Sequence, residues 1–416
     1  MPHFVPQPWI KAQAAKLLVG CVIALIVCSN LPLTNGLANQ HQIDNRLTAA
    51  STRFSFRLYD QILKRRSSGN TFVSPTSIML ALAMTYNGAD GTTRQAMART
   101  LEIEGMSLEE VNQAFADLKS TLALTDPKIQ LKIANSLWAR NGFAIKPEFI
   151  ARNKQFYQAE LASLNFADPA AVRTINSWVN KNTEGKIEKI IESIGGDDVL
   201  FLINAIYFKG QWQFEFDKKK TKPDVFRLDG GEQKELPMMS QSGSYLYQEN
   251  KDFQAVALPY GSGTVSMYIF LPNEQAGLDQ FERKLTAENW DVWMKSFGVR
   301  PGDVTLPRFK VEWESNLNKA LIALGMPEAF DDRADFSEIA EPIGGNKIFI
   351  SEVLHKSWCE VNEEGTVAAA ATSVRATLTS LPPPKFVMKV DRPFFFAIRE
   401  NQTGAALFMG SVTNPE

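Results

Sequence analysis

The order in which two hydrophobic periodicities follow each other limits what this chain can fold into. Apolar residues recur at helical spacing mainly in the first half, which predicts helices at 48–63, 77–86, 107–124 and 172–182. β-Branched and aromatic runs predict strands, at 70–73, 129–139, 199–209, 254–259, 265–271, 304–307, 309–313, 348–355, 357–361, 386–390, 394–399 and 406–412. Helices that dominate the first half and strands that dominate the second predict an α+β fold with large, mostly antiparallel sheets.

The N-terminus has the features of a signal peptide, predicted at 1–38. Lys11 and Lys16 precede an apolar run at 17–28, which is shorter than the roughly 20 residues that span a bilayer. We place cleavage after Ala38 and expect a secreted protein, extracellular or periplasmic, with no membrane segment in its mature form. The residues before Cys21 also resemble a lipoprotein signal, which leaves a lipid anchor at Cys21 as the alternative.

Composition excludes several classes for the mature chain, in which residues 39–416 show no boundary and are predicted to form one domain. The formal net charge of −2 gives no support to nucleic-acid binding. The basic cluster of Lys218, Lys219 and Lys220 with Lys222 is interpreted as a solvated turn rather than a polyanion site. Cys359 is the one cysteine left after the leader, so no internal disulfide can form.

The search for enzymatic chemistry centres on His355, the one histidine in the expected folded body. A Ser-His-Asp or Cys-His hydrolase needs a histidine as general base, but His355 lies in an apolar strand, where a buried, hydrogen-bonded role is favoured. No zinc-ligand cluster and no phosphate-binding loop occurs, so we expect neither metal nor cofactor. The many carboxylates leave a glycosidase pair open, although no pattern selects two of them.

The stretch from Gly365 to Thr372 consists almost entirely of small side chains. Such a segment can be a loop in one state and a strand in another, because no bulky group forbids either. Four consecutive alanines favour a helix or a linker as the alternative. No proline or glycine interrupts 366–380, so a central strand is compatible with the sequence.

With its flanking motifs, this stretch resembles the hinge and reactive loop of a serpin, the serine protease inhibitor superfamily. The motifs follow in order along the mature chain, at 70–77 (NTFVSPTS), 87–93, 204–212 (NAIYFKGQW), 306–310, 324–330, 392–394 and 406–415. The resemblance implies a serpin-like fold, with large sheets, a helical cluster and an exposed reactive-centre loop at about 363–384. It also implies that the protein is an inhibitor, not an enzyme, and that it is a monomer.

In such inhibitors a protease attacks the loop and is trapped as an acyl-enzyme when the cut loop enters the central sheet. The resemblance places the reactive bond at Thr379–Ser380, with Leu378–Thr379 as the alternative, and implies a covalent complex with an elastase-, chymotrypsin- or subtilisin-like serine endopeptidase. The implied hinge consists of Glu363, Glu364, Gly365, Thr366, Val367, Ala368, Ala369, Ala370, Ala371 and Thr372. Val367 departs from the usual pattern, in which an acidic residue is frequent.

Other positions correspond to the elements that control sheet opening. Ser74, Ser77, Asn204 and His355 match the shutter beneath the sheet, and Trp212 matches the breach where the loop first enters. The segment at 107–124 matches a heparin-binding helix but has one basic residue, Lys119, so no heparin site is expected. Two other functions stay open: a non-inhibitory carrier or chaperone on the same fold, and a cross-class inhibitor of a cysteine protease.

Insertion requires that alternate side chains suit each face of the sheet. The face expected to point inward consists of Thr366, Ala368, Ala370, Thr372, Val374 and Ala376. The other carries Val367, Ala369, Ala371, Ser373, Arg375 and Thr377. Arg375 is the one charge, and it is expected to fall on a face that tolerates it.

Overall fold

Strand β4 (Leu200–Gln211) is apolar on both faces, as a strand covered on both sides requires, and it lies at the centre of the functional sheet. The computed structural model describes residues 44–66, 68–123, 126–341, 347–366 and 384–415. The six-stranded sheet has the order β10-β11-β4-β2-β3, with β12 beside β4. Its other strands are β2 (Ile129–Arg140), β3 (Glu160–Leu164), β10 (Phe309–Asn316), β11 (Glu352–Val361) and β12 (Gly365–Thr366).

A second, nine-stranded sheet has the order β1-β15-β14-β8-β7-β6-β9-β13, and β5 pairs with β6. Its strands are β1 (Thr71–Val73), β5 (Lys222–Arg227), β6 (Gln233–Glu249), β7 (Phe253–Tyr260), β8 (Val265–Pro272), β9 (Gly298–Pro307), β13 (Phe386–Lys389), β14 (Phe394–Glu400) and β15 (Ala406–Val412). Antiparallel pairs predominate among the described strands, and the parallel ones are β4–β11, β2–β3 and β9–β13. The predicted α+β class with mostly antiparallel sheets is confirmed.

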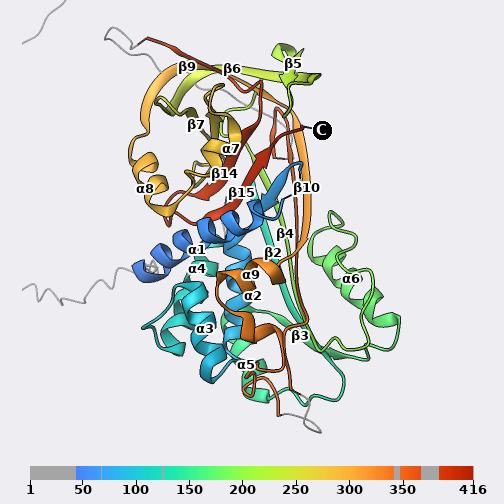
Figure 1. Cartoon of the computed structure of the whole chain (residues 1–416). Coiled ribbons are helices and arrows are strands. Elements are labelled where there is room, and N and C mark those ends of the chain that lie inside the picture. The colour runs from blue at the N-terminus through green and yellow to red at the C-terminus, as the bar shows by residue number, and fades with distance from the viewer. Residues whose placement is uncertain (1–43, 67, 124–125, 342–346, 367–383, 416) are drawn as a thin grey trace, which may run out of the picture. The chain divides into compact units, whose positions relative to one another are not determined.

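Most helices gather on one face of the six-stranded sheet, whereas α6 lies on its other face, and α7 and α8 lie beside the nine-stranded sheet (Figure 1). The helices are α1 (Asn45–Leu63), α2 (Pro75–Tyr86), α3 (Gly91–Leu101), α4 (Leu108–Leu122), α5 (Pro147–Tyr157), α6 (Ala170–Asn182), α7 (Gly277–Glu282), α8 (Ala287–Lys295) and α9 (Asn318–Leu324), with 3-10 turns η1 (Lys218–Lys220) and η2 (Pro327–Phe330). Helix α2 is buried all round, as its mostly apolar sequence predicts. The Ser107–Glu110 capping box opens α4.

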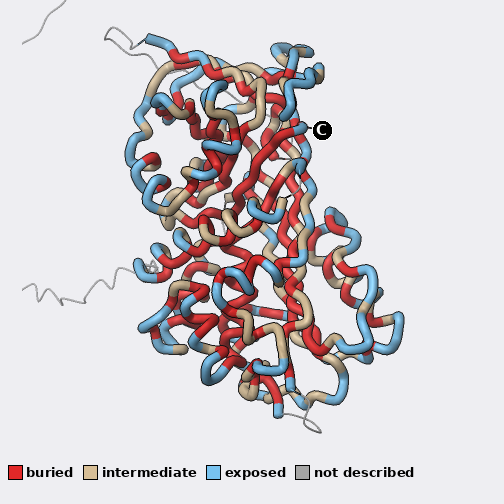
Figure 2. The backbone as a smooth tube through the Cα atoms, in the orientation of Figure 1, coloured by how far each residue is buried: buried red, intermediate tan, exposed pale blue. Residues whose placement is uncertain are grey.

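Residues of β4 are buried along nearly the whole strand (Figure 2). Its alternate side chains enter two separate cores. Leu202, Ile206 and Phe208 face the main core, which the helical cluster and both sheets share. Phe201, Ile203, Ala205 and Tyr207 face a smaller core beneath α6. Both faces of the central sheet are therefore covered along most of β4.

Several predicted boundaries were wrong. The strands expected at 348–355 and 357–361 form one strand, β11, which begins at Glu352. Lys356 lies between the two predicted strands, and its ammonium group pairs with Glu312 and Glu314 of β10 while the strand continues. The long strand β6 and the helices α3, α5, α7, α8 and α9 were missed, because their polar residues weaken the periodic signal. No helix in the described parts of the chain has the length and apolarity needed to span a bilayer.

Candidate functional site

The parallel strands β4 and β11 meet along a line that we call the seam. The seam opens at one end, and the start of the small-residue stretch enters there. Cα pairing between the two strands runs from Phe201–Glu352 to Tyr207–Trp358 and then stops. Beyond it, β12 pairs antiparallel with β4, with Gly365 opposite Gln211 and Thr366 opposite Gly210. The chain thus leaves β11, turns at 362–365 and returns along β4.

Two ion pairs with neighbouring elements hold the turn at 362–365 in place. The Glu363 side chain is 2% exposed and accepts hydrogen bonds from Arg308 Nε at 2.9 Å and Thr221 Oγ1 at 2.5 Å. Burial by itself raises the pKa of Glu363, but the hydrogen bonds from Arg308 and Thr221 outweigh burial and lower it below its ordinary value. The next carboxylate, Glu364, pairs with Lys218. Two successive acidic residues are therefore each matched by a cation.

Gly365 is required by its surroundings. Its φ is +141°, and a Cβ would lie 2.1 Å from the Gly210 carbonyl oxygen and 2.7 Å from the Gln211 Cα. Only a residue without a side chain allows this close approach between β12 and β4.

Trp212 lies directly beside the turn. Its indole N–H donates to the Asn362 carbonyl at 2.9 Å, and its backbone N–H donates to the Glu364 carbonyl at 3.0 Å. Its ring stacks on Tyr260 with centroids 4.3 Å apart. The Tyr260 hydroxyl in turn lies 2.8 Å from Thr366 Oγ1, and Thr366 is fully buried. These contacts hold the turn and Thr366 in place.

A polar cluster lies further down, under β4 and β11. His355 Nε2 accepts from the Ser74 N–H at 3.2 Å, and His355 Nδ1 lies 2.5 Å from Asn204 Oδ1. The Asn204 amide also donates to Ser77 Oγ at 2.5 Å, and it contacts Asn135. Since Nε2 accepts, the proton of a neutral imidazole lies on Nδ1 and is donated to Asn204. Burial lowers the pKa of His355 to about 3, so the ring stays neutral.

Comparison with known proteins decides the family. The model of the family described as "Serpin (serine protease inhibitor)" matches residues 49–415. The chain belongs to the serpin family. A leukocyte elastase inhibitor of Bos taurus is 39% identical over 383 residues, which cover 89% of this chain and all of the relative. The family and this relative support a protease inhibitor rather than an enzyme.

Solved serpin structures have the same fold. The thermophilic serpin tengpin in its native state matches with a TM-score of 0.83 and 33% identity, over 90% of this chain and 95% of tengpin. Human thyroxine-binding globulin, solved with its ligand, matches with a TM-score of 0.81 and 28% identity, over 89% of this chain and 99% of the globulin. The predicted serpin fold is confirmed.

The structure brings together most of the predicted serpin site residues that it describes. Ser74, Ser77, Asn204 and His355 form one hydrogen-bonded cluster, and Trp212 lies at the other end of the seam beside Glu363, Glu364, Gly365 and Thr366. The remaining hinge positions, Val367 to Thr372, and the reactive-bond candidates Leu378, Thr379 and Ser380 lie outside the described residues.

Sequence reasoning missed the partners of the predicted hinge residues. Arg308, Lys218, Thr221 and Tyr260 were not selected, although the lysine cluster was noted. Lys218, Lys219 and Lys220 form an exposed 3-10 turn, as predicted, but Lys218 pairs with the Glu364 carboxylate. A buried glutamate such as Glu363 is expected to need a cation beside it. The sequence alone does not tell which lysine or arginine lies near it in the fold.

The face of the sheet that was expected to tolerate the charge of Arg375 is covered. The side of β4 that carries Phe201 and Tyr207 is buried beneath α6. A loop residue on that side would therefore enter a covered layer.

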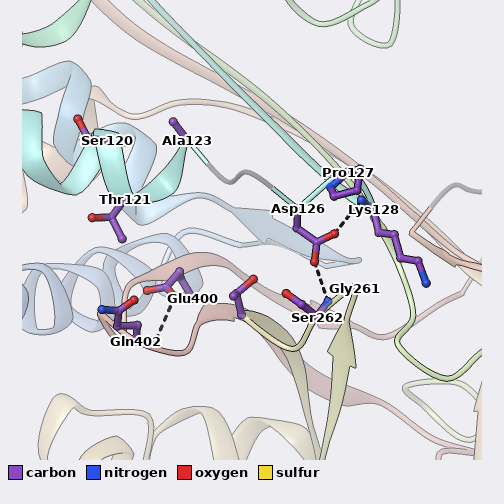
Figure 3. Close-up of a pocket in the computed structure, with 11 residues that line it drawn as sticks. Ser120, Thr121, Ala123, Asp126, Pro127, Lys128, Gly261, Ser262, Glu400 and Gln402 are labelled. Atoms are coloured by element: carbon purple, nitrogen blue, oxygen red, sulfur yellow. Dashed lines mark hydrogen bonds between the residues drawn. The ribbon is translucent and has the colours of Figure 1, made fainter. Parts of the chain in front are cut away.

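A separate open pocket lies between the end of α4, the β7–β8 turn and the turn after β14 (Figure 3). Its lining is hydroxyl-rich, and Asp126 accepts from the Ser262 N–H at 2.6 Å. Its lining meets the end of β4 that pairs with β12, because the Gln211 N–H donates to the Lys128 carbonyl at 2.9 Å and the Gly261 N–H donates to the Gln211 carbonyl at 2.8 Å. Among its described lining residues there is no histidine or cysteine. Among the residues that the structure describes, no His, Cys, Asp or Glu group has the arrangement of a metal site.

Proposed function

We propose that this serpin is a secreted inhibitor of serine endopeptidases that traps its target as an acyl-enzyme. The cut loop, residues 366–379, would enter the six-stranded sheet as a new strand between β4 and β11. The observation that carries this proposal is the pairing of Gly365 and Thr366 with β4 just beyond the last β4–β11 pair. The first residues of the loop already run in the direction that insertion would continue.

The length of the seam supports the proposal. Each step forward in the loop is one step back in β4, so Thr372 would lie opposite Asn204 and Ala376 opposite Leu200, the first residue of β4. The segment 365–376 therefore matches the full length of β4. The proposed reactive bond, Thr379–Ser380, follows just beyond, where the chain would leave the sheet.

The same register supports the proposed inward face. Ala368, Ala370 and Val374 would lie opposite Phe208, Ile206 and Leu202, whose side chains face the main core. Directly opposed residues of antiparallel strands point to the same side. Small or β-branched, uncharged residues suit that layer, and an uncharged Thr372 would reach the polar cluster at Asn204.

The chemical step involves only the protease and the loop. The protease's serine hydroxyl would add to the carbonyl carbon of Thr379, and its proton would pass to the leaving amine of Ser380. An ester to Thr379 would replace the peptide bond. Insertion would then carry the ester-linked protease away from the geometry that deacylation needs.

The identity of the target is proposed from the loop and one relative. Thr379, or Leu378 in the alternative register, suits elastase-, chymotrypsin- or subtilisin-like pockets, and the Bos taurus relative is named a leukocyte elastase inhibitor. Secretion rests on the leader at 1–38, and a mature N-terminus that begins at Asn39 in culture medium would support it. We further propose a monomer that needs no heparin.

The decisive experiment mixes the mature protein with pancreatic elastase, chymotrypsin or subtilisin and separates the products on a denaturing gel. A band at the summed mass supports the proposal, and mass spectrometry of the released C-terminal fragment gives the cleaved bond. Cleavage without any adduct, together with no gain in stability of the cut protein, would favour a non-inhibitory carrier. Thyroxine-binding globulin has a name that describes such a carrier. An adduct with papain alone would indicate a cysteine protease as the target.

A further inference from the structure

The open pocket shown in Figure 3 has the size and the lining of a site for a small molecule. Its volume is about 590 Å³, and ligand pockets usually enclose about 300–1,000 Å³. Four separate segments contribute to its lining: the end of α4, the residues before β2, the β7–β8 turn and the turn after β14. We call it the polar pocket and define it by Ser120, Asp126, Lys128, Ser262, Glu400 and Gln402.

Two carboxylates of the polar pocket are each stabilised by two backbone N–H donors. Asp126 accepts from the Lys128 N–H at 2.9 Å and from the Ser262 N–H at 2.6 Å, one on each oxygen. Glu400 accepts two N–H groups of the turn that follows it, at 3.0 and 2.6 Å, again one on each oxygen. An ionised carboxylate has about four sites that can accept a hydrogen bond. Both side chains therefore need no cation and can still accept hydroxyl groups of a ligand.

The remaining polar groups of the lining can both donate and accept hydrogen bonds. The side chains of Ser120, Thr264 and Gln402 line the pocket and make no hydrogen bond with the residues that the structure describes. Hydroxyl and amide groups match the hydroxyl groups of a sugar, which also donate and accept. Lys128 is the one cation of the described lining and stands beside two carboxylates, so a sulfated or phosphorylated ligand is disfavoured.

The residues that line the pocket also hold the end of β4. The Gln211 N–H donates to the Lys128 carbonyl at 2.9 Å, and the Gly261 N–H donates to the Gln211 carbonyl at 2.8 Å. A Cβ at Gly261 would lie 2.3 Å from Asp126 Oδ2, so the β7–β8 turn packs directly on this carboxylate. Gln211 lies opposite Gly365 in β12. The pocket lining and the first residue of β12 therefore meet at one residue of β4.

A ligand in the pocket would join the two sheets. Asp126 precedes β2 of the six-stranded sheet, whereas Gln402 follows β14 of the nine-stranded sheet. Gln211 is bonded to the same two parts of the fold, since Lys128 precedes β2 and Gly261 follows β7. A molecule that binds both Asp126 and Gln402 would keep the two parts at the spacing that holds Gln211.

We infer that the polar pocket binds a short uncharged saccharide and that the bound saccharide stabilises the pairing of Gly365 with Gln211. A ligand shifts an equilibrium only by its difference in affinity for the two states. The difference arises here because the pocket keeps its shape while Gln211 is held between Lys128 and Gly261. Binding can be measured whether or not the protein forms an adduct with a protease.

The test adds maltose, cellobiose or sucrose to the full mature protein and measures hydrogen exchange by mass spectrometry. We expect at least one of the three to slow exchange in peptides that cover 126–128, 261–264 and 400–402. At a concentration about tenfold above its Kd, a ligand should slow exchange through the unbound state about tenfold. The peptide that covers 362–366 should slow at least about twofold through coupling. A peptide that covers α6 is the internal control and should not change.

Matched variants locate the bound saccharide. Thr264→Val and Gln402→Leu keep the approximate volume of each side chain but remove its hydrogen-bonding groups. Each should weaken binding about two- to tenfold in a calorimetric titration, because one net hydrogen bond is lost or more. Gln275→Leu is the control, since Gln275 lies in the exposed turn after β8 and outside the pocket lining, and it should bind as the wild type does.

The outcomes separate the two parts of the inference from other causes. Failure of all three saccharides to bind overturns it, and so does binding of inorganic sulfate in their place. Affinity that is unchanged in the Thr264→Val, Gln402→Leu double variant means that the saccharide binds elsewhere. Slower exchange that extends to α6 means a general effect of the sugar solution, which also overturns the site. Protection of the pocket peptides without any change at 362–366 overturns the link to β12.

Discussion

The Arg308 guanidinium group forms a hydrogen-bonded ion pair with the buried carboxylate of Glu363. Its Nε lies 2.9 Å from both carboxylate oxygens, and its Nη2 lies 2.6 Å from Oε1. Glu363 belongs to the turn that sends the chain from β11 into β12, whereas Arg308 lies between β9 and β10. The pair therefore ties the start of the loop to the edge of the seam.

Replacement of Arg308 by methionine should destabilise the turn that holds Glu363. It leaves Glu363 buried with Thr221 as its remaining side-chain donor, and we expect the free energy of unfolding to fall by about 1–3 kcal/mol. Lys218→Met is the matched control, because Lys218 pairs with Glu364 at an exposed position and should cost about 0–1 kcal/mol. Guanidinium unfolding measures both. Equal losses in the two variants would contradict the assigned role of the buried pair.

Gly365→Ala should expel β12 from the sheet. The new Cβ would overlap the Gly210 carbonyl oxygen, and alanine rarely adopts the φ of +141°. We expect a loss of at least ~2 kcal/mol in unfolding free energy and faster hydrogen exchange at 362–366. Gly105→Ala is the control, since Gly105 also has a positive φ, +81°, but nothing lies within 4 Å of its Cβ. If both variants behave alike, close approach is not what requires Gly365.

Thr366→Arg should convert an inhibitor into a substrate. Thr366 is fully buried against Tyr260, and a charge there costs several kcal/mol unless it finds a partner. With elastase we expect at least a tenfold lower yield of adduct and a matching rise in cleaved protein. Thr366→Val keeps the shape without a charge and should inhibit nearly normally. An unchanged adduct yield in Thr366→Arg would show that the inward face is wrongly assigned.

Acid should destabilise the protein through His355. Burial lowers its pKa to about 3 in the folded state, against about 6.5 in the unfolded chain. The unfolded state therefore binds the extra proton between these values, and stability present above pH 6.5 is lost as pH falls toward 3. Between pH 6 and pH 4, His355 should account for a loss of about 2–3 kcal/mol in unfolding free energy.

His355→Gln supplies the control for the pH experiment. Glutamine keeps a polar side chain but does not titrate, so unfolding free energies measured from pH 4 to pH 7 should vary less in this variant. A pH profile identical to that of the wild type would mean that other groups cause the acid loss.

Local patterns were enough to predict the elements whose burial follows from their own residues. Helix α2 and strand β4 are mostly apolar, so each could be assigned as a helix or a strand from its own residues. His355 lies in an apolar strand, which predicted a buried, hydrogen-bonded ring. In these cases each residue's environment is set mainly by its neighbours in the chain.

Pairings between distant segments could not be predicted in this way. Arg308 and Glu363 are 55 residues apart, and Lys218 and Glu364 are 146 apart. Many lysines and arginines were available to either carboxylate, and the choice depends on how the two sheets meet. The packing of α6 over Phe201 was missed for the same reason. The sequence of β4 does not tell which element covers the side of the strand that carries Phe201.

Arg375 offers the last test, because α6 covers the face on which it would arrive. If the register of β12 continues, Arg375 lies opposite Phe201, which is paired with Glu352 in β11. Burial and the neighbouring Asp198 raise the pKa of Glu352, so a cation there would be stabilising. We expect Arg375→Gln and Glu352→Gln each to lower the guanidinium midpoint of the cleaved protein. Their coupling should be about 0.5–1 kcal/mol in cleaved protein and absent in uncleaved protein. The loop must be cut beyond Ala376, as the mass of the released fragment can verify, and zero coupling would show that Arg375 arrives elsewhere.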